Sequence, residues 1–212
     1  MRVITGSAHG KKLITPDGLD VRPTVARVKE AVFSSLQFDI EGRTILDLFA
    51  GSGQLGIEAL SRGAKHCFFV DNSKVSLKAV RSNLANCKLE SNATVVEKDS
   101  FSFIKTTTKT FDIAYLDPPY NKGIINDIMP ELVEKMSDFG IIVCEYADKN
   151  ELSESYGDFN LKKTVKYGNI FISYYKKGED WFYGKNSSLS RKLWPYYKRS
   201  SWYCSACISR FW

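Results

Sequence analysis

Short apolar runs alternate with stretches of helical periodicity from Ile45 onward. This alternation is typical of βα units that build a parallel sheet. Ser73 is a candidate N-cap, and Gly63 is a candidate first residue beyond a helix end. The predicted strands are TILDLF, HCFFVD, ATVVEK, FDIAYLD and GIIVCEY, and the predicted helices span residues 54–62, 73–86, 101–105 and 123–136.

Two flanking segments complete the predicted fold. The runs NLKKTVKY and NIFISYY flank a Gly168-Asn169 turn and predict an antiparallel hairpin that closes the sheet. Ahead of the sheet, RVITGSAHGKKLIT predicts a small hairpin, and TVARVKEAVFSSLQ predicts an amphipathic helix capped by Thr24. The apolar stripe of that helix is Val25, Val28, Val32 and Leu36.

The composition fits one main globular domain. The chain has 212 residues, of which 43% are hydrophobic and 25% charged. No apolar run reaches the roughly 18 residues of a membrane helix, and the start of the chain lacks the apolar core of a signal peptide, so we expect a cytoplasmic protein without membrane contact. Cys67, Cys87 and Cys144 lie in apolar or helical stretches and predict packing thiols in a reducing compartment.

The net charge of +6 belongs to the last 32 residues. Six of the 30 basic residues and all four Trp follow Asp180, and no acidic residue does, so residues 1–180 carry 24 basic and 24 acidic groups. With each Trp read as a UGA codon and a one-base shift of frame, suitable codons for this tail spell a sequence that resembles the start of phosphopantetheine adenylyltransferase. We hypothesise that the natural protein stops at Asp180 and that residues 181–212 are read-through; the alternative is a basic, aromatic RNA-binding tail.

A glycine-rich turn, DLFAGSGQLG, follows the first predicted strand of the sheet and fits the nucleotide-binding pattern G-x-G-x-x-G. The pattern suits both NAD and S-adenosylmethionine, but the Asp47 carboxylate would repel a pyrophosphate and attract a methionine ammonium. Asp71 ends the next strand, where it could bind ribose hydroxyls, and the pair Asp99-Ser100 follows the third strand, where it could meet the adenine amine. The candidate cofactor-binding residues are Asp47, Phe49, Gly51, Gly53, Asp71, Asn72, Asp99 and Ser100.

The stretch LDPPY ends the fourth strand on an acid, two prolines and a tyrosine. An exocyclic base amine is a poor nucleophile until hydrogen bonds direct its lone pair toward the methyl group. Asp117 and the Pro118 carbonyl could accept its two hydrogens, on a turn that proline makes stiff. An extruded base could stack on Tyr120. We therefore take Asp117, Pro118, Pro119 and Tyr120 as the candidate catalytic residues and predict no metal.

FAGSGQLGIEALSRGA, LDPPY and RPTVARVKEAVFSSL together resemble the RsmD-type family of 16S ribosomal RNA guanine-N2 methyltransferases, over nearly all of residues 1–177. The resemblance implies a Rossmann-like class I methyltransferase fold of the α/β class, with a mostly parallel seven-stranded sheet and S-adenosylmethionine as cofactor. It also implies that the N2 amine of a guanine is methylated and that Arg22, Thr24 and Arg27 meet the RNA. The DPPY motif alone is shared with DNA adenine and cytosine amino-methyltransferases.

We expect residues 1–40 to contact RNA, residues 41–180 to form the methyltransferase domain, and residues 181–212 to be a tail that is not native. The expected substrate is 16S rRNA within a partly assembled small subunit, and the expected state is a monomer. Phosphate contacts are expected from a local basic patch. Two alternatives remain besides a dehydrogenase: a DNA amino-methyltransferase, disfavoured because the chain lacks a sequence-reading domain, and a non-catalytic RNA-binding module. The patch comprises Arg2, Lys11, Lys12, Arg22, Arg27 and Lys29.

Overall fold

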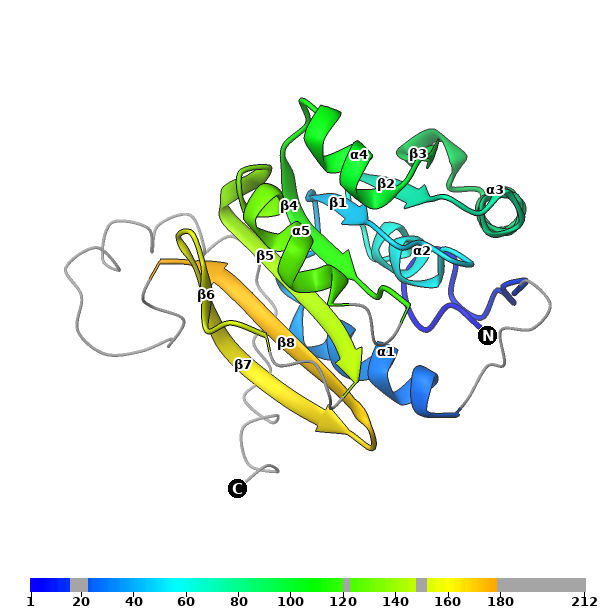
Figure 1. Ribbon diagram of the computed structural model, residues 1–212. Helices are drawn as coiled ribbons and strands as arrows, with labels where there is room; N and C mark the ends of the chain where they lie inside the picture. Colours follow the sequence, from blue (N-terminus) through cyan, green and yellow to red (C-terminus); the bar gives the residue numbers. More distant parts are fainter. Residues whose placement is uncertain (16–22, 120–122, 148–151, 179–212) are drawn as a thin grey trace, which may run out of the picture. The chain divides into compact units, whose positions relative to one another are not determined.

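The computed structural model describes residues 1–15, 23–119, 123–147 and 152–178, and for residues 23–25 it describes the backbone only. A helix, α1, precedes a sheet whose parallel strands alternate with helices, and an antiparallel hairpin ends the described part (Figure 1). In chain order the elements are α1 (Pro23–Ser35), β1 (Thr44–Asp47), α2 (Gln54–Ser61), β2 (His66–Asp71), α3 (Lys74–Cys87), η1 (Glu90–Asn92), β3 (Ala93–Glu97), α4 (Ser100–Thr106), β4 (Phe111–Leu116), α5 (Ile124–Val133), β5 (Met136–Ala147), β6 (Ser155–Tyr156), β7 (Phe159–Tyr167) and β8 (Ile170–Lys177).

The described sheet has the strand order β3-β2-β1-β4-β5-β8-β7-β6. Strands β1 to β5 run parallel to their neighbours, whereas β8, β7 and β6 add to the edge of β5 in antiparallel pairs. The mostly parallel sheet with a C-terminal antiparallel hairpin is therefore confirmed. The sequence pattern missed two elements, the short 3-10 helix η1 and the two-residue edge strand β6, and the described sheet has eight strands where seven were expected.

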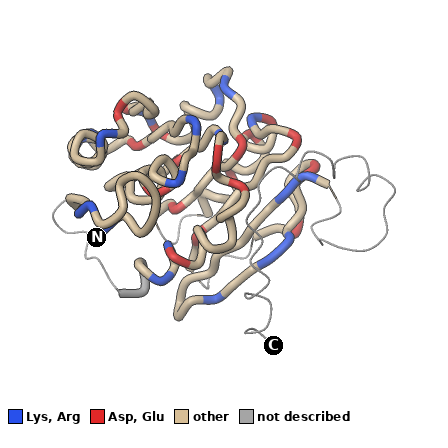
Figure 2. The backbone as a smooth tube through the Cα atoms, turned by 180° about the vertical axis from the view of Figure 1, so that it is seen from behind, with Lys and Arg blue, Asp and Glu red and all other residues tan. Residues whose placement is uncertain are grey.

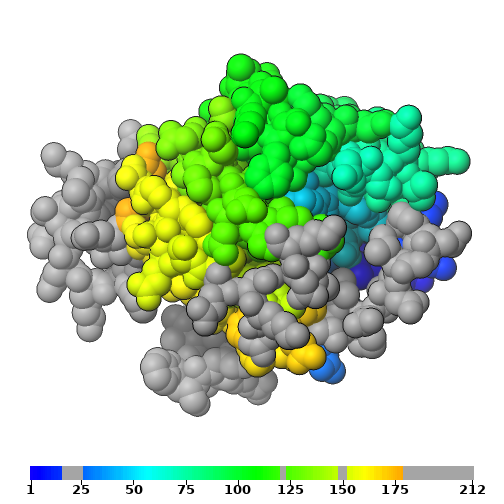
Figure 3. Space-filling view, in the orientation of Figure 1, coloured from blue at the N-terminus to red at the C-terminus, as the bar shows by residue number. Residues whose placement is uncertain are grey.

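Helices cover both faces of the parallel part of the sheet, which is why its strands read as apolar runs. Helices α1, α2 and α3 pack their apolar side chains on one face, and α4 and α5 pack theirs on the other (Figure 1). In β1, Ile45 faces the first group and Leu46 the second, as the alternation of side chains along a strand requires. Figure 3 shows α4, α5 and the β6–β7 turn side by side on one surface of the molecule.

Local signals account for two of the predicted helix ends. Ser73 caps α3, since its Oγ accepts a hydrogen bond from the Ser76 amide at 3.3 Å. Gly63 takes a φ of 94° directly after the cap of α2, as predicted. Helix α5 ends at Val133, three residues before the predicted end. The reason is tertiary, because Met136 begins β5 and lies in register with Phe111 of β4.

The N-terminal segment departs from the prediction in two ways. The expected hairpin is a single antiparallel bridge between Arg2 and Lys12, supported by a hydrogen bond of 2.8 Å from the Leu13 amide to the Met1 carbonyl. Helix α1 already includes Pro23, so Thr24 lies in its first turn and is not the N-cap. Proline favours the first helical position because its missing N–H would have no partner there.

The predicted apolar stripe of α1 is buried at Val28, Val32 and Leu36, as expected. Lys29 is a correction, because it is only 2% exposed and cannot belong to a phosphate-binding patch. Its Nζ lies 3.2 Å from the Glu58 carboxylate of α2 and donates to the Arg2 carbonyl at 2.7 Å. This lysine holds the N-terminal segment and two helices together.

Cys67, Cys87 and Cys144 are buried free thiols, which confirms that they pack in the core. Within the described ranges, no helix has the length and apolar character needed to cross a membrane. Residues 179–212, on which the read-through hypothesis depends, lie outside the described residues. That hypothesis and the predicted domain boundaries stay predictions.

Candidate active site

Four carboxylates reach the carboxyl ends of neighbouring strands. The register partners of Asp47 are Phe69 of β2 and Tyr115 of β4. Asp71 and Asp117 lie two residues beyond these partners, so they point to the same face of the sheet as Asp47. Glu145 of β5 also belongs to this face, because Val143 is the register partner of Tyr115. Ligands of open α/β sheets bind at this edge.

The predicted glycine-rich turn joins β1 to α2 and is held by two of these carboxylates. Gly51 and Gly53 take φ values of 51° and 75°, which only glycine adopts at little cost. Asp71 accepts hydrogen bonds of 2.8 Å from the amides of Gly51 and Ser73. Asp47 accepts one of 3.0 Å from the Gly56 amide. The carboxylates at the ends of β1 and β2 therefore fix the shape of the turn.

Gly56 brings α2 close to the sheet. A Cβ at this position would lie 2.3 Å from a ring carbon of Phe69 and 2.6 Å from the Cys67 sulfur. The third glycine of the pattern is thus required for close packing of helix on strand, and the first two shape the turn.

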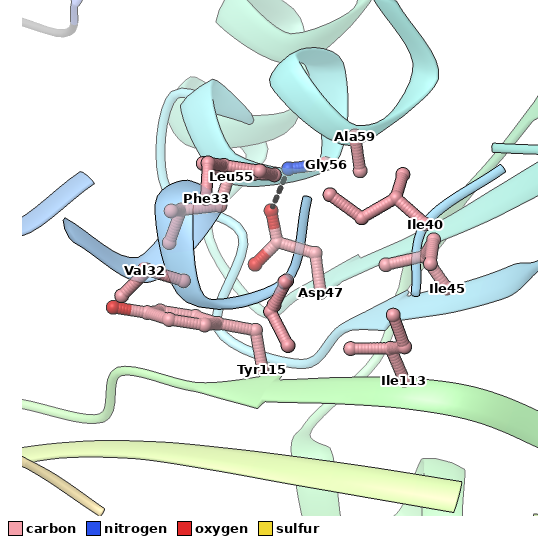
Figure 4. A pocket seen from close by; sticks show the side chains of 11 residues that line it. Val32, Phe33, Ile40, Ile45, Asp47, Leu55, Gly56, Ala59, Ile113 and Tyr115 are labelled. Carbon is pink, nitrogen blue, oxygen red and sulfur yellow. Dashed lines mark hydrogen bonds between the residues drawn. The ribbon is translucent and has the colours of Figure 1, made fainter. Parts of the chain in front are cut away.

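Asp47 lies in a pocket between α1, α2 and the sheet and is only 2% exposed. The pocket is lined mainly by apolar side chains, and the Asp47 carboxylate lies between the start of α2 and the Tyr115 ring (Figure 4). Burial is the main cause that raises the pKa of Asp47 to about 7. The hydrogen bond from the Gly56 amide acts in the opposite direction, and the negative charge of Asp71 raises the pKa further. A cationic ligand would stabilise the ionised form of this carboxylate.

A second carboxyl cluster lies on β4 and β5. The Tyr115 hydroxyl donates a hydrogen bond of 2.5 Å to Oε2 of Glu145, and both residues are buried. The Asp117 residue keeps part of its surface exposed, but burial of its carboxyl raises its pKa well above the usual range. The negative charge of Glu145 is the second cause of this raised pKa, ahead of that of Asp47. Glu145 and Asp47 therefore lie close enough to Asp117 to oppose its ionisation.

Sequence reasoning missed Glu145 and Gln54. Glu145 lies inside an apolar strand run, and the signal available was an acid at a position expected to be buried. Gln54 begins α2 directly after the glycine-rich turn, and its Oε1 is the one buried side-chain oxygen among the described residues that has no hydrogen-bond partner. An orphaned acceptor of this kind indicates a place for a donor group of a ligand.

The other predicted cofactor-binding residues lie outside these carboxylate clusters. The exposed Asp99 caps α4, where its carboxylate accepts a hydrogen bond of 2.9 Å from the Ser102 amide. Hydrogen bonds to Ser102 lower the pKa of Asp99, and Ser100 is the first residue of α4. Phe49 packs against the α4 and α5 side of the core, and Asn72 is exposed.

The predicted catalytic turn and RNA contacts are described only in part. Pro118 is buried, Pro119 is exposed, and Arg27 is exposed on α1. Arg22, Tyr120 and the side chain of Thr24 lie outside the described residues. Across the parts of the chain that the structure describes, no group of three His, Cys, Asp or Glu residues is placed to hold a metal ion.

The sequence matches the protein family described as Conserved hypothetical protein 95 over residues 1–176. The chain belongs to this family. One relative is YlbH of Bacillus subtilis, provisionally named an rRNA methyltransferase, which is 38% identical over 182 residues, 84% of this chain and 99% of YlbH. Another is the Ribosomal RNA small subunit methyltransferase D of Escherichia coli strain K12, which is 31% identical over 179 residues, 84% of this chain and 90% of the relative.

A solved structure agrees with these relatives. The Escherichia coli protein yhhF, provisionally named a methyltransferase, has a TM-score of 0.77 to this chain at 32% identity, with 85% of this chain and 99% of that chain covered. The resemblance to the RsmD-type family and the Rossmann-like methyltransferase fold are both confirmed.

Proposed function

We propose that this protein transfers the methyl group of S-adenosylmethionine to the N2 amine of a guanine in 16S ribosomal RNA. Membership of the family and the names of its relatives support methyl transfer to small-subunit rRNA. One structural observation carries the reaction type: Asp117 directly follows β4 and begins the D-P-P segment, on the same sheet face as Asp47 and the glycine-rich turn. The amine that receives the methyl group, bound at Asp117, would meet the cationic methyl donor, bound at Asp47 and the glycine-rich turn.

The residues present fit the cofactor. Gly51 has open space where a side chain would project, so the backbone can approach a ligand there. Asp47 and the orphaned Oε1 of Gln54 lie at either end of the turn, suited to the ammonium group of the methionine moiety and to another N–H donor. Asp71, half-exposed at the end of β2, suits ribose hydroxyls. When bound, S-adenosylmethionine supplies an electrophilic methyl group on a sulfonium.

The protein's part in the reaction is to orient the amine. The lone pair of a base amine is delocalised into the ring, so the amine needs two acceptors that hold it pyramidal. Asp117 accepts one N–H and the Pro118 carbonyl the other, and the two prolines limit movement of the turn. Transfer of the methyl group from sulfur to the amine nitrogen would make that nitrogen acidic, and the Asp117 carboxylate would take the proton that it sheds. Tyr120 is proposed to stack on the extruded base.

The substrate we propose is a partly assembled small subunit, bound by a monomer in the cytoplasm, where ribosomes are built. Figure 2 shows acidic segments near the middle of the described body and basic segments on the β7–β8 hairpin and near the N-terminus. Local basic patches of this kind can position RNA without a large net charge. Arg22, Thr24 and Arg27 are proposed to contact the RNA, and Lys29 is not, because it is buried.

The proposed function is tested with small subunits from a strain that lacks the protein. Incubation with the purified full chain and isotopically labelled S-adenosylmethionine should place one label per subunit in an N2-methylguanosine, identified by mass spectrometry of digested 16S rRNA. Genomic DNA serves as the competing substrate. Label in adenine or cytosine of DNA, with none in rRNA, would assign the protein to the DNA amino-methyltransferases instead.

Replacing Asp71 with alanine should weaken S-adenosylmethionine binding by about 1.5–3 kcal/mol. The change removes an acceptor for ribose hydroxyls and also releases the Gly51 amide, which Asp71 holds at 2.8 Å. Isothermal titration calorimetry measures the effect. Ser73→Ala is the control, since it removes only the 3.3 Å bond to the Ser76 amide and should leave cofactor affinity near that of the wild type.

Binding of S-adenosylmethionine should tighten as the pH rises through about 7. The pKa of Asp47 is raised to about 7, so its ionised fraction in the free protein grows roughly eightfold between about pH 6 and pH 7.5. Because the ionised form attracts the ammonium group, affinity should increase by a similar factor. Asp47→Asn keeps an acceptor for the Gly56 amide but cannot ionise, so calorimetry should find weaker binding that follows only the cofactor's own titration.

A further inference from the structure

The DPPY turn does not by itself distinguish guanine from other bases with an amine. Its two acceptors serve the hydrogens of an exocyclic amine, which adenine and cytosine also carry. The bases differ in the ring nitrogens next to that amine. The guanine amine lies between N1, which carries a hydrogen, and N3, which carries a lone pair, whereas the one neighbouring ring nitrogen in adenine (N1) or cytosine (N3) carries a lone pair. An additional acceptor beside the one that binds the amine would therefore select guanine through its N1–H.

Glu145 occupies that place. Leu116 and Cys144 are register partners in the parallel β4–β5 pair, so the next residues, Asp117 and Glu145, lie side by side where β4 ends. Neighbouring strands are about 4.8 Å apart, which matches two acceptors that serve adjacent N–H groups of one base. Both residues lie on the sheet face of Asp47 and α1.

Tyr115 fixes the orientation of this second carboxylate. Its hydroxyl donates to Oε2 of Glu145 at 2.5 Å, and Glu145 is only 5% exposed. A carboxylate offers about four acceptor positions, so a carboxylate can serve several donors at once. The lone pairs of its oxygens also repel a lone pair that is brought against them in a buried site. The charge of Glu145 already raises the pKa of Asp117, which places the two groups within short range.

We propose that Glu145 is the residue that selects guanine, by accepting a hydrogen bond from guanine N1–H while Asp117 accepts one from the N2 amine. This inference rests on the proposed function. Adenine and cytosine are rejected because each would direct a lone pair at the Glu145 carboxylate. A site built to bind an N–H discriminates strongly against an analogue that lacks it.

The test uses 2-aminopurine, which keeps the 2-amine of guanine but has a lone pair at N1. Small subunits are reconstituted with guanine or 2-aminopurine at the methylated position, and single-turnover rates of methyl transfer and equilibrium affinities are measured for both. The wild-type protein should prefer guanine by about 100-fold or more. Glu145→Gln, whose amide can donate to N1, should reduce that preference by roughly 100-fold and increase the rate on 2-aminopurine.

Glu90→Gln is the matched control, because it makes the same chemical change at an exposed position on η1 and should keep the wild-type preference. Equal rates of the wild type on both bases would overturn the inference even if Glu145→Gln failed to fold. An unchanged preference in a folded Glu145→Gln protein would overturn it as well. Failure of the wild type to methylate guanine would instead remove the proposed function.

Discussion

Replacing Asp117 with alanine is expected to lower the single-turnover rate of methyl transfer by about 10²–10³-fold, the usual effect of losing one hydrogen bond made in the transition state. The bond matters chiefly while the amine approaches the methyl group, so affinity for S-adenosylmethionine should change little. Asp117→Asn keeps one acceptor oxygen in nearly the same place and should retain more activity than Asp117→Ala. Rates are measured on partly assembled small subunits beside thermal melts and cofactor titrations.

The control is Asp158→Ala in the turn between β6 and β7, where the aspartate side chain is 80% exposed and lies outside the site. It should leave the rate unchanged. A folded Asp117→Ala protein that binds the cofactor and transfers methyl at nearly the wild-type rate would remove Asp117 from the mechanism. Joint loss of stability, cofactor binding and rate would show that the D-P-P turn only ends a strand.

The largest loss of stability is expected from Glu58→Ala, about 3–5 kcal/mol in the free energy of unfolding. Glu58 is fully buried, and its carboxylate accepts hydrogen bonds of 2.7 and 3.0 Å from the amides of Ile4 and Thr5. It also lies 3.2 Å from Lys29 and 2.9 Å from Arg62. Its removal leaves the buried Lys29 ammonium without its counter-charge and releases the N-terminal segment from α2.

Thermal and denaturant unfolding measure this loss, which corresponds to a fall in Tm on the order of 10 °C for a domain of this size. The surface pair of Lys177 and Asp138 has the same 2.9 Å separation as Arg62 and Glu58, but Asp138→Asn should hardly change Tm because both partners are exposed to water. In a Glu58→Gln background, Lys29→Met should restore stability, since it removes the unpaired charge. Further destabilisation by that second change would contradict the role given to the buried pair.

The sequence by itself determined the succession of strands and helices along the chain, and it predicted where the candidate site lies. Apolar runs fixed the parallel strands because both faces of such strands are buried, and Ser73 and Gly63 fixed helix ends because caps act locally. The glycine-rich turn and the D-P-P turn were recognisable for the same reason, since the backbone conformation of each depends on neighbouring residues. The acids at Asp47, Asp71 and Asp117 followed from the rule that ligands meet the carboxyl ends of parallel strands.

Only the tertiary structure decided which polar groups are buried and what they contact. Lys29 has the sequence pattern of an exposed helical cation, and it is buried because Glu58, from another helix, balances its charge. Glu145 lies beside Asp117 because β5 is next to β4 in a register that pairs Leu116 with Cys144. The raised pKa of Asp47 likewise results from helices α1 and α2 closing over β1. Register, burial and charge pairing depend on residues far apart in the chain, so the local periodicity of the sequence does not predict them.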